Sequence, residues 1–369
     1  MTNPYRGLND FCFWSSAMAA PAPGHVDPTV RSDRIEADHQ VATIGSCFAQ
    51  HISRHIAAAG MNYLVTEKAP SAMPPEAARS AGYGVFSARY GNVYTVRQAL
   101  QLFDRAFGNF EPAEQAWKRG DRYIDPFRPQ VEREGYGSPE EIRAATASHL
   151  GCVREVFTKA DWLVFTLGLT EAWRSRQDGA VFPLAPGVAG GQFSPELHEF
   201  VNFSAGEVRD DLLAFATRIA DVNPRMKILL TVSPVPLIAT YEKRHVLVST
   251  TFSKAALRVA ADEAERMLGN VIYFPSYEII TSPASSGRYY ADDLRQVTEL
   301  GIKHVMRVFS KHYLPVAMQA EERKTGLDEV TALDPSFDVM CDEEFIQRAL
   351  RQEGYLSDID TTTESKRMA

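Results

Sequence analysis

A serine stands where an apolar run gives way to a helical pattern, in residues 42–60 (ATIGSCFAQHISRHIAAAG). Ser46 follows the short run VATIG and precedes a stretch with helical periodicity. Serine is a common helix N-cap, because its hydroxyl accepts a free N–H of the first turn. It can also serve as a nucleophile there, since the partial positive charge of a helix N-terminus stabilises an oxyanion.

Polar side chains also follow three other apolar runs. Thr170 and Glu171 come after DWLVFTLG, Ser233 follows KILLTV, and Asp292 and Asp293 come after NVIYFPSYEII. The carboxyl ends of parallel strands meet at one edge of a sheet, where α/β proteins bind their ligands. A hydroxyl, carboxylates and backbone N–H groups gathered at one edge suit nucleophilic acyl transfer.

Alternating strand and helix patterns would position these residues. Short, continuous apolar runs predict buried strands at 41–45, 161–168, 226–237 and 270–277. Periodic segments predict helices within 46–60, 90–108, 138–160, 204–224, 251–268 and 298–314. This alternation predicts an α/β fold with a parallel, doubly wound sheet.

Capping residues mark the expected ends of several helices. Ser46, Ser138 and Thr298 stand at predicted N-caps, and Gly60 stands at a C′ position. Glu141 follows Ser138 by three residues, which predicts a capping box.

Bulk composition narrows the class of protein. The chain has 369 residues, 45% hydrophobic and 23% charged, with a net charge of −8 and no basic block. These values are typical of a globular protein and exclude a nucleic-acid or anionic membrane surface as the main partner. No apolar run is long enough to span a membrane.

Four scattered cysteines predict reduced thiols in a cytoplasmic protein. We read residues 10–24 as folded chain rather than a signal peptide.

Two segments are expected along the chain. Residues 1–315 form one α/β domain, with an insertion around 108–136. Residues 316–369 form a polar extension that is partly disordered and includes one short amphipathic segment, DEEFIQRALRQ.

Seven sequence blocks resemble a known family in content and order. They are GSCFA (45–49), YGNVYT (90–95), TLGLTEAW (166–173), TVSPVPL (231–237), SKAALR (253–258), YFPSYEI (273–279) and RYYADDLR (288–295). Together they resemble the GSCFA family, a branch of the SGNH/GDSL-type hydrolases, over roughly residues 10–312. The resemblance implies a three-layer α/β/α sandwich with a mostly parallel, flavodoxin-like sheet.

The resemblance also implies roles for individual residues. Ser46 matches the family nucleophile, whose own N–H is an oxyanion donor. Gly91 and Asn92 match the block that supplies a glycine N–H, and Thr170 stands where an asparagine is usual. The missing amide would then come from Asn92, or a hydroxyl from Thr170.

The general base is the open point of this comparison. The usual pattern is Asp-x-x-His, and here Asp293 matches the aspartate while Gln296 stands at the histidine. Glutamine does not titrate near neutral pH and cannot act as a base. His304 is the nearest substitute, oriented by Asp293 or Asp292.

Other interpretations stay open for these residues. His304 lies at the margin of a buried helical stripe, so a structural role is an equal alternative. His51 and His55 point away from Ser46 on their helix, and His245 follows the TVSPVPL loop. Glu171 could orient a base, bind a substrate hydroxyl, or simply pair with Arg174.

The combined pattern predicts a serine esterase or acyl hydrolase acting on an O-acyl ester, such as that of a carbohydrate. The alternatives are an O-acyltransferase in polysaccharide modification and a catalytically silent glycan-binding protein, which Gln296 favours. No cofactor or metal is expected, because the sequence has neither a ligand cluster nor a dinucleotide loop. The expected partner is a small-molecule or glycan ester, and the sequence leaves the oligomeric state open.

Overall fold

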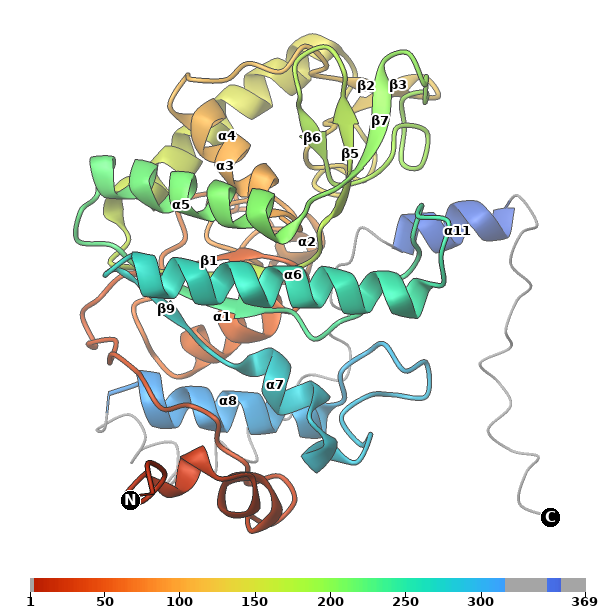
Figure 1. Cartoon of the computed structure of the whole chain (residues 1–369). Helices are drawn as coiled ribbons and strands as arrows, with labels where there is room; N and C mark the ends of the chain where they lie inside the picture. Colours follow the sequence, from red (N-terminus) through yellow and green to blue (C-terminus); the bar gives the residue numbers. More distant parts are fainter. Residues whose placement is uncertain (1–2, 316–343, 353–369) are drawn as a thin grey trace, which may run out of the picture.

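The computed structural model describes residues 3–315 and 344–352 (Figure 1). Its main sheet has four parallel strands in the order β1-β4-β8-β9. The strands are β1 (Val41–Gly45), β4 (Trp162–Leu167), β8 (Lys227–Val232) and β9 (Val271–Tyr273). All four lie within predicted apolar runs, which confirms the α/β fold.

A short extended segment continues the sheet beyond β1. Tyr63 forms a parallel bridge with Val41, and the N–H of Leu64 donates to the Val41 carbonyl oxygen at 2.9 Å. From β1 the chain therefore crosses first to this outer edge and later to β4 on the other side. Open α/β sheets bind ligands at such a reversal, at the carboxyl ends of the strands. Ser46 lies at this place.

Helices cover both faces of the sheet, as expected for three layers (Figure 1). One face packs against α3 (Val96–Ala106), α4 (Pro139–Lys159), α5 (Ala205–Val222) and α6 (Val246–Met267). The other packs against α1 (Ala49–Ala58), α7 (Ser276–Thr281) and α8 (Glu299–Tyr313). Successive strand residues alternate between the two cores: Leu163 and Phe165 belong to the first, and Trp162 and Val164 to the second.

Most of the predicted caps are present. The hydroxyls of Ser138 and Thr298 accept N–H groups of their helices, and Gly60 has the positive φ of a C′ residue. The predicted capping box is wrong, because the Glu141 carboxylate accepts the N–H of Gly137 instead.

Ser46 is not a helix cap, which corrects a second expectation. α1 begins at Ala49 with Phe48 at its N-cap, and the Ala49 N–H donates to the Ser46 carbonyl oxygen at 2.9 Å. A turn therefore separates the strand from the helix and leaves the Ser46 hydroxyl without a capping role.

Smaller elements surround one end of the sheet. A hairpin pairs β2 (Trp117–Arg119) with β3 (Arg122–Ile124) inside the predicted insertion. A second sheet, not predicted, has the order β6-β5-β7. Its strands are β5 (Glu171–Ser175), β6 (Val181–Phe182) and β7 (His198–Asn202). The remaining elements are α2 (Pro75–Ser80), α11 (Glu344–Gln352) and short helical turns at Asp10–Cys12, Ser15–Ala19 and Pro283–Ser285.

Within the described ranges, α11 coincides with the predicted amphipathic segment, and the rest of the polar extension lies outside them. No described helix combines the length and apolar character that a membrane crossing requires. The thiols of Cys12, Cys47 and Cys152 are free, and Cys341 lies outside the described residues.

Candidate active site

Ser46 is placed by an unusually close approach of two strands. Gly45 has φ +136°, and a Cβ at this position would fall 2.3 Å from the Thr166 carbonyl oxygen, so only glycine fits. The Ser46 residue is 2% exposed, and its Oγ has no hydrogen-bond partner among the described residues. A buried hydroxyl without a partner lowers stability, so its presence here indicates a use other than folding.

A small pocket surrounds the Ser46 side chain. It is lined by Ser46, Cys47, Tyr94, Gly168, Leu169, Ser233, Val235, Pro236, Leu237 and Lys254. These residues come from the carboxyl ends of β1, β4 and β8, from the segment before α3, and from α6. The prediction that the loops after the first three strands meet at one edge is thus confirmed.

Lys254 brings an amine to the same pocket. It lies on α6, is 2% exposed, and donates from Nζ to the Gly168 carbonyl oxygen at 2.6 Å. A Cβ on Gly168 would lie 3.1 Å from the Cβ of Ser46, so Gly168 lies against the Ser46 side chain as well as bonding Lys254. Sequence analysis did not single out Lys254, although a lysine in line with Leu257 and Ala261 on a buried helical stripe was the available signal.

Two of the expected oxyanion donors are already engaged. The Ser46 N–H donates to the Thr166 carbonyl oxygen at 3.1 Å, and the Thr170 hydroxyl donates to Asn202 Oδ1 at 2.7 Å. Each of these two donors is therefore already used in a hydrogen bond within the fold.

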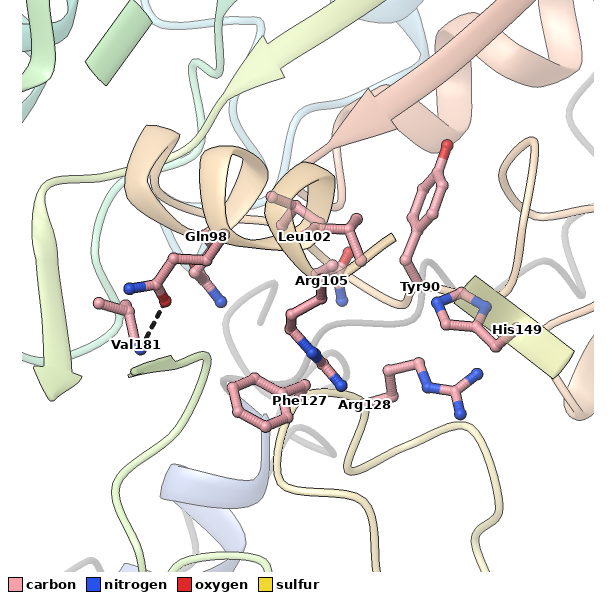
Figure 2. A pocket seen from close by; sticks show the side chains of 11 residues that line it. Tyr90, Gln98, Leu102, Arg105, Phe127, Arg128, His149 and Val181 are labelled. Atoms are coloured by element: carbon pink, nitrogen blue, oxygen red, sulfur yellow. Dashed lines mark hydrogen bonds between the residues drawn. The ribbon is translucent and has the colours of Figure 1, made fainter. Parts of the chain in front are cut away.

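The Gly91–Asn92 turn also faces away from the serine pocket. Gly91 has φ +67°, and the Asn92 side chain accepts from Gln50 Nε2 at 3.4 Å and lines a different pocket (Figure 2). By contrast, the Cys47 N–H has no recorded acceptor among the described residues, and Cys47 lines the serine pocket. The N–H that follows a nucleophile is a common oxyanion donor.

Glu171, on β5, bonds the segment that follows β8 and is not among the residues that line the serine pocket. Its Oε1 accepts the Thr240 hydroxyl at 2.7 Å, and its Oε2 accepts the Tyr241 N–H at 3.4 Å. Burial raises the pKa of this carboxyl group above its ordinary value. Arg174 pairs with Glu199 instead, so the proposed Glu171–Arg174 pair is absent among the described ion pairs.

Asp293 and Gln296 lie at the mouth of the site in an exposed turn. Asp293 Oδ1 accepts the backbone N–H groups of Arg295 and Gln296, both at 2.9 Å. Both residues line a wider groove whose walls include Pro236 and Leu237, which also line the serine pocket. Asp293 thus stabilises a turn rather than orienting a histidine.

His304 lies elsewhere and has two partners. Its Nδ1 accepts the Tyr289 hydroxyl at 2.7 Å, and its Nε2–H donates to the Val26 carbonyl oxygen at 2.8 Å. Burial lowers the pKa of His304. No contact among the described residues connects it with Ser46, so the structure does not bring the predicted Ser46, His304 and Asp293 together.

The other histidines considered as candidate bases also bond residues other than Ser46. His51 contacts Arg54, His55 contacts Ser310, and His245 caps α6 by accepting the Leu247 N–H. In residues 3–315 and 344–352, no three His, Cys, Asp or Glu side chains are arranged to hold a metal ion. Among the described residues that line the Ser46 pocket, Lys254 is the one with an amine or imidazole group.

Fold and site together define an α/β protein with a buried, unpartnered serine at the carboxyl edge of a parallel sheet. The chain belongs to the GSCFA family, whose model matches residues 40–309. No curated protein matches the sequence. One similar solved structure is a carbohydrate esterase family 2 enzyme with a carbohydrate binding domain from Corynascus thermopiles (Myceliophthora fergusii). It is 13% identical, with a TM-score of 0.25, over 83% of this chain and 68% of that chain.

Proposed function

We propose that the protein is a serine acyl hydrolase that cleaves an O-acyl ester, such as an acylated carbohydrate, with Ser46 as nucleophile. The observation that carries this proposal is the buried Ser46 hydroxyl, which has no hydrogen-bond partner among the described residues and shares its pocket with Lys254. Serine and lysine form the catalytic pair of several unrelated hydrolases, so histidine is not required.

Each group has a definite part in the reaction. Ser46 Oγ forms a bond to the acyl carbon while its proton passes to Lys254 Nζ, which must be unprotonated to accept it. The carbonyl oxygen becomes an oxyanion that accepts the Cys47 N–H. The ester bond breaks, and the leaving alkoxide takes the proton from Lys254. Water then attacks the acyl-enzyme by the same route and releases the acid and free Ser46.

Lys254 is preferred to His304 as the base because of what each nitrogen contacts. Both ring nitrogens of His304 hold structural partners, whereas Lys254 Nζ is fixed at the edge of the serine pocket by Gly168. The Ser46 and Lys254 side chains are not hydrogen-bonded to each other, and catalytic hydrogen bonds often tighten only when substrate binds.

Acyl transfer is the second candidate, and one feature favours it. The wider groove next to the serine pocket is lined by Asp293, Gln296, Arg348 and Arg351, which offers polar contacts to an acceptor alcohol. Transfer and hydrolysis share the acyl-enzyme and differ in whether an alcohol or water attacks it.

The test uses p-nitrophenyl acetate and butyrate, together with labelling by a fluorophosphonate, which reacts with activated serines. Wild type, Ser46→Ala, Lys254→Met, Lys254→Arg and His304→Ala are compared, with Lys227→Met as a control for loss of a lysine outside the site. Ser46→Ala and Lys254→Met should lose both turnover and label, while folded His304→Ala should keep them.

Different failures have different meanings. If Ser46→Ala keeps the wild-type rate, Ser46 is not the nucleophile. Labelling of Ser46 without turnover, restored by adding an alcohol acceptor, would favour acyl transfer. Loss of rate in His304→Ala but not in Lys254→Met would assign the base to His304.

A further inference from the structure

A second pocket lies between α3, α4 and the segments that contain residues 90–93 and 127–128. It is lined by Tyr90, Asn92, Val93, Gln98, Gln101, Leu102, Arg105, Phe127, Arg128, His149 and Val181. Figure 2 shows Arg105, Arg128 and His149 gathered around this space, with the Phe127 ring beside Arg105. It shares no lining residue with the Ser46 pocket.

Three buried polar atoms at this pocket have no partner. They are Arg105 Nε, Arg128 Nη2 and His149 Nε2, each without a hydrogen bond among the described residues. Arg128 is 5% exposed and His149 is 2% exposed. Buried polar atoms are nearly always paired, so three orphans around one small space indicate an absent partner.

Other atoms of these three side chains contact neighbouring residues. Arg128 Nε donates to Asp125 Oδ2 at 2.8 Å, and His149 Nδ1 bonds Glu67 Oε2 at 2.6 Å. Arg105 stacks on Phe127, with its guanidinium carbon 3.9 Å from the ring centroid. No described residue forms an ion pair or side-chain hydrogen bond with Arg105, unlike Arg128.

The protonation of His149 follows from its neighbours. Burial alone would raise the pKa of Glu67, but the hydrogen bond from His149 and the nearby charge of Arg128 lower it to about 2. Glu67 is therefore a carboxylate and accepts the Nδ1–H of His149. Burial also lowers the pKa of His149 to about 4, which leaves Nε2 as a bare acceptor at neutral pH. The pocket thus presents two guanidinium donors and one imidazole acceptor.

We propose that this pocket binds a small, singly charged oxyanion that also carries an O–H group. Its oxygens would accept from Arg105 Nε and Arg128 Nη2, and its O–H would donate to His149 Nε2. Guanidinium groups match the geometry of carboxylate and phosphate oxygens. A single charge is favoured over a double one because the Asp125 and Glu67 carboxylates formally balance the two guanidinium charges. Bicarbonate, dihydrogen phosphate and a 2-hydroxycarboxylate such as glycolate share this chemistry.

Thermal unfolding of the full chain tests the proposal, with bicarbonate, phosphate and glycolate as separate probes. Acetate is the matched probe, since it resembles glycolate without the hydroxyl, and sodium chloride sets the ionic strength. At least one O–H-bearing anion should raise Tm saturably by about 5 °C, while acetate raises it much less. The Ser46→Ala variant should respond like wild type, because the two pockets are separate.

Two variants locate the effect. Arg105→Met should abolish the ligand-induced shift, which is measured from the variant's own ligand-free Tm because the change also removes the stacking on Phe127 and the attraction to Asp125. Arg154→Met is the matched control, since Arg154 donates to the Ala106 carbonyl oxygen outside the pocket, and it should keep the shift.

Three results would overturn the proposal. They are the absence of a saturable shift with every O–H-bearing anion, an acetate response as large as that of the most effective O–H-bearing anion, and an unchanged shift in Arg105→Met. The first would mean that water alone fills the pocket. Calorimetric titration of wild type with glycolate and acetate gives the same decision if Arg105→Met does not fold.

Discussion

Ser46 and His304 are both buried polar residues, but their surroundings differ. The Ser46 hydroxyl has no described hydrogen-bond partner and opens on a pocket with Lys254. His304 lies on α8 against the second core, and both ring nitrogens are bonded, to Tyr289 and to Val26. The comparison teaches that hydrogen-bond satisfaction separates the two roles. His304 has the complete set of partners expected of a structural residue, whereas Ser46 has the unpaired hydroxyl that its proposed role requires.

The largest expected effect is loss of activity in Ser46→Ala. We expect ester hydrolysis to fall by at least about 10³-fold, because the acyl-enzyme can no longer form. The free energy of unfolding should stay the same or rise by up to about 1 kcal/mol, since an unpaired buried hydroxyl is removed. Parallel assays and urea titrations measure both quantities.

Ser53→Ala is the matched control for this change. Ser53 is also buried, but its hydroxyl contacts the Gln50 and Val85 carbonyl oxygens. We expect it to lose stability by about 1 kcal/mol and to keep its activity per folded molecule. Loss of activity in folded Ser53→Ala, or loss of stability with full activity in Ser46→Ala, would contradict the comparison.

His304→Ala should show the reverse of Ser46→Ala. It removes two hydrogen bonds and leaves a cavity beside Tyr289, so we expect about 3 kcal/mol of destabilisation with activity retained in the folded fraction. Urea unfolding combined with rates below the transition checks this. If His304→Ala folds but is inactive, the result would instead support the triad of Ser46, His304 and Asp293 that the sequence predicted.

Gly168→Ala should affect the site more than the fold. A Cβ there would lie 2.9 Å from the Tyr94 carbonyl oxygen and 3.1 Å from Ser46 Cβ, so the backbone must shift. We expect kcat to fall about tenfold, through the displaced serine and Lys254. Gly151→Ala is the matched control: it lies in α4 with open space around it and should gain about 0.5–1 kcal/mol of stability.

The smallest effect concerns pH and a buried histidine on α1, His55, whose Nε2 bonds the Ser310 hydroxyl. Burial lowers the pKa of His55 to about 4, below its value in the unfolded chain. The unfolded state therefore binds more protons between pH 6.5 and 4, and stability is lost as the pH falls through this window. The contribution is about 1 kcal/mol per pH unit below pH 6. Urea midpoints from pH 7.5 to 5 should show a shallower decline in His55→Gln, and an identical slope would contradict this.

Much of the fold could be predicted because its signals are local. Continuous apolar runs gave the four strands, and Ser138 and Thr298 marked helix starts through contacts with residues three positions away. The β6-β5-β7 sheet escaped prediction, since its short strands mix polar and apolar residues without clear alternation. Ser46 was predicted as a site residue and, wrongly, as a helix cap, because a strand-to-helix serine looks the same in both roles.

The contacts of the candidate base and candidate oxyanion donors were harder to predict, because they depend on distant partners. By itself, the amino-acid sequence determined that a serine follows the first strand, that hydroxyls and carboxylates follow the others, and that the usual histidine position holds Gln296. Only the tertiary structure decided that His304 is bonded to Val26, 278 residues away, and that Lys254 meets Gly168, 86 residues away. Folding distributes a limited set of hydrogen-bond partners, and which polar groups remain unpaired becomes visible only when the whole chain is packed.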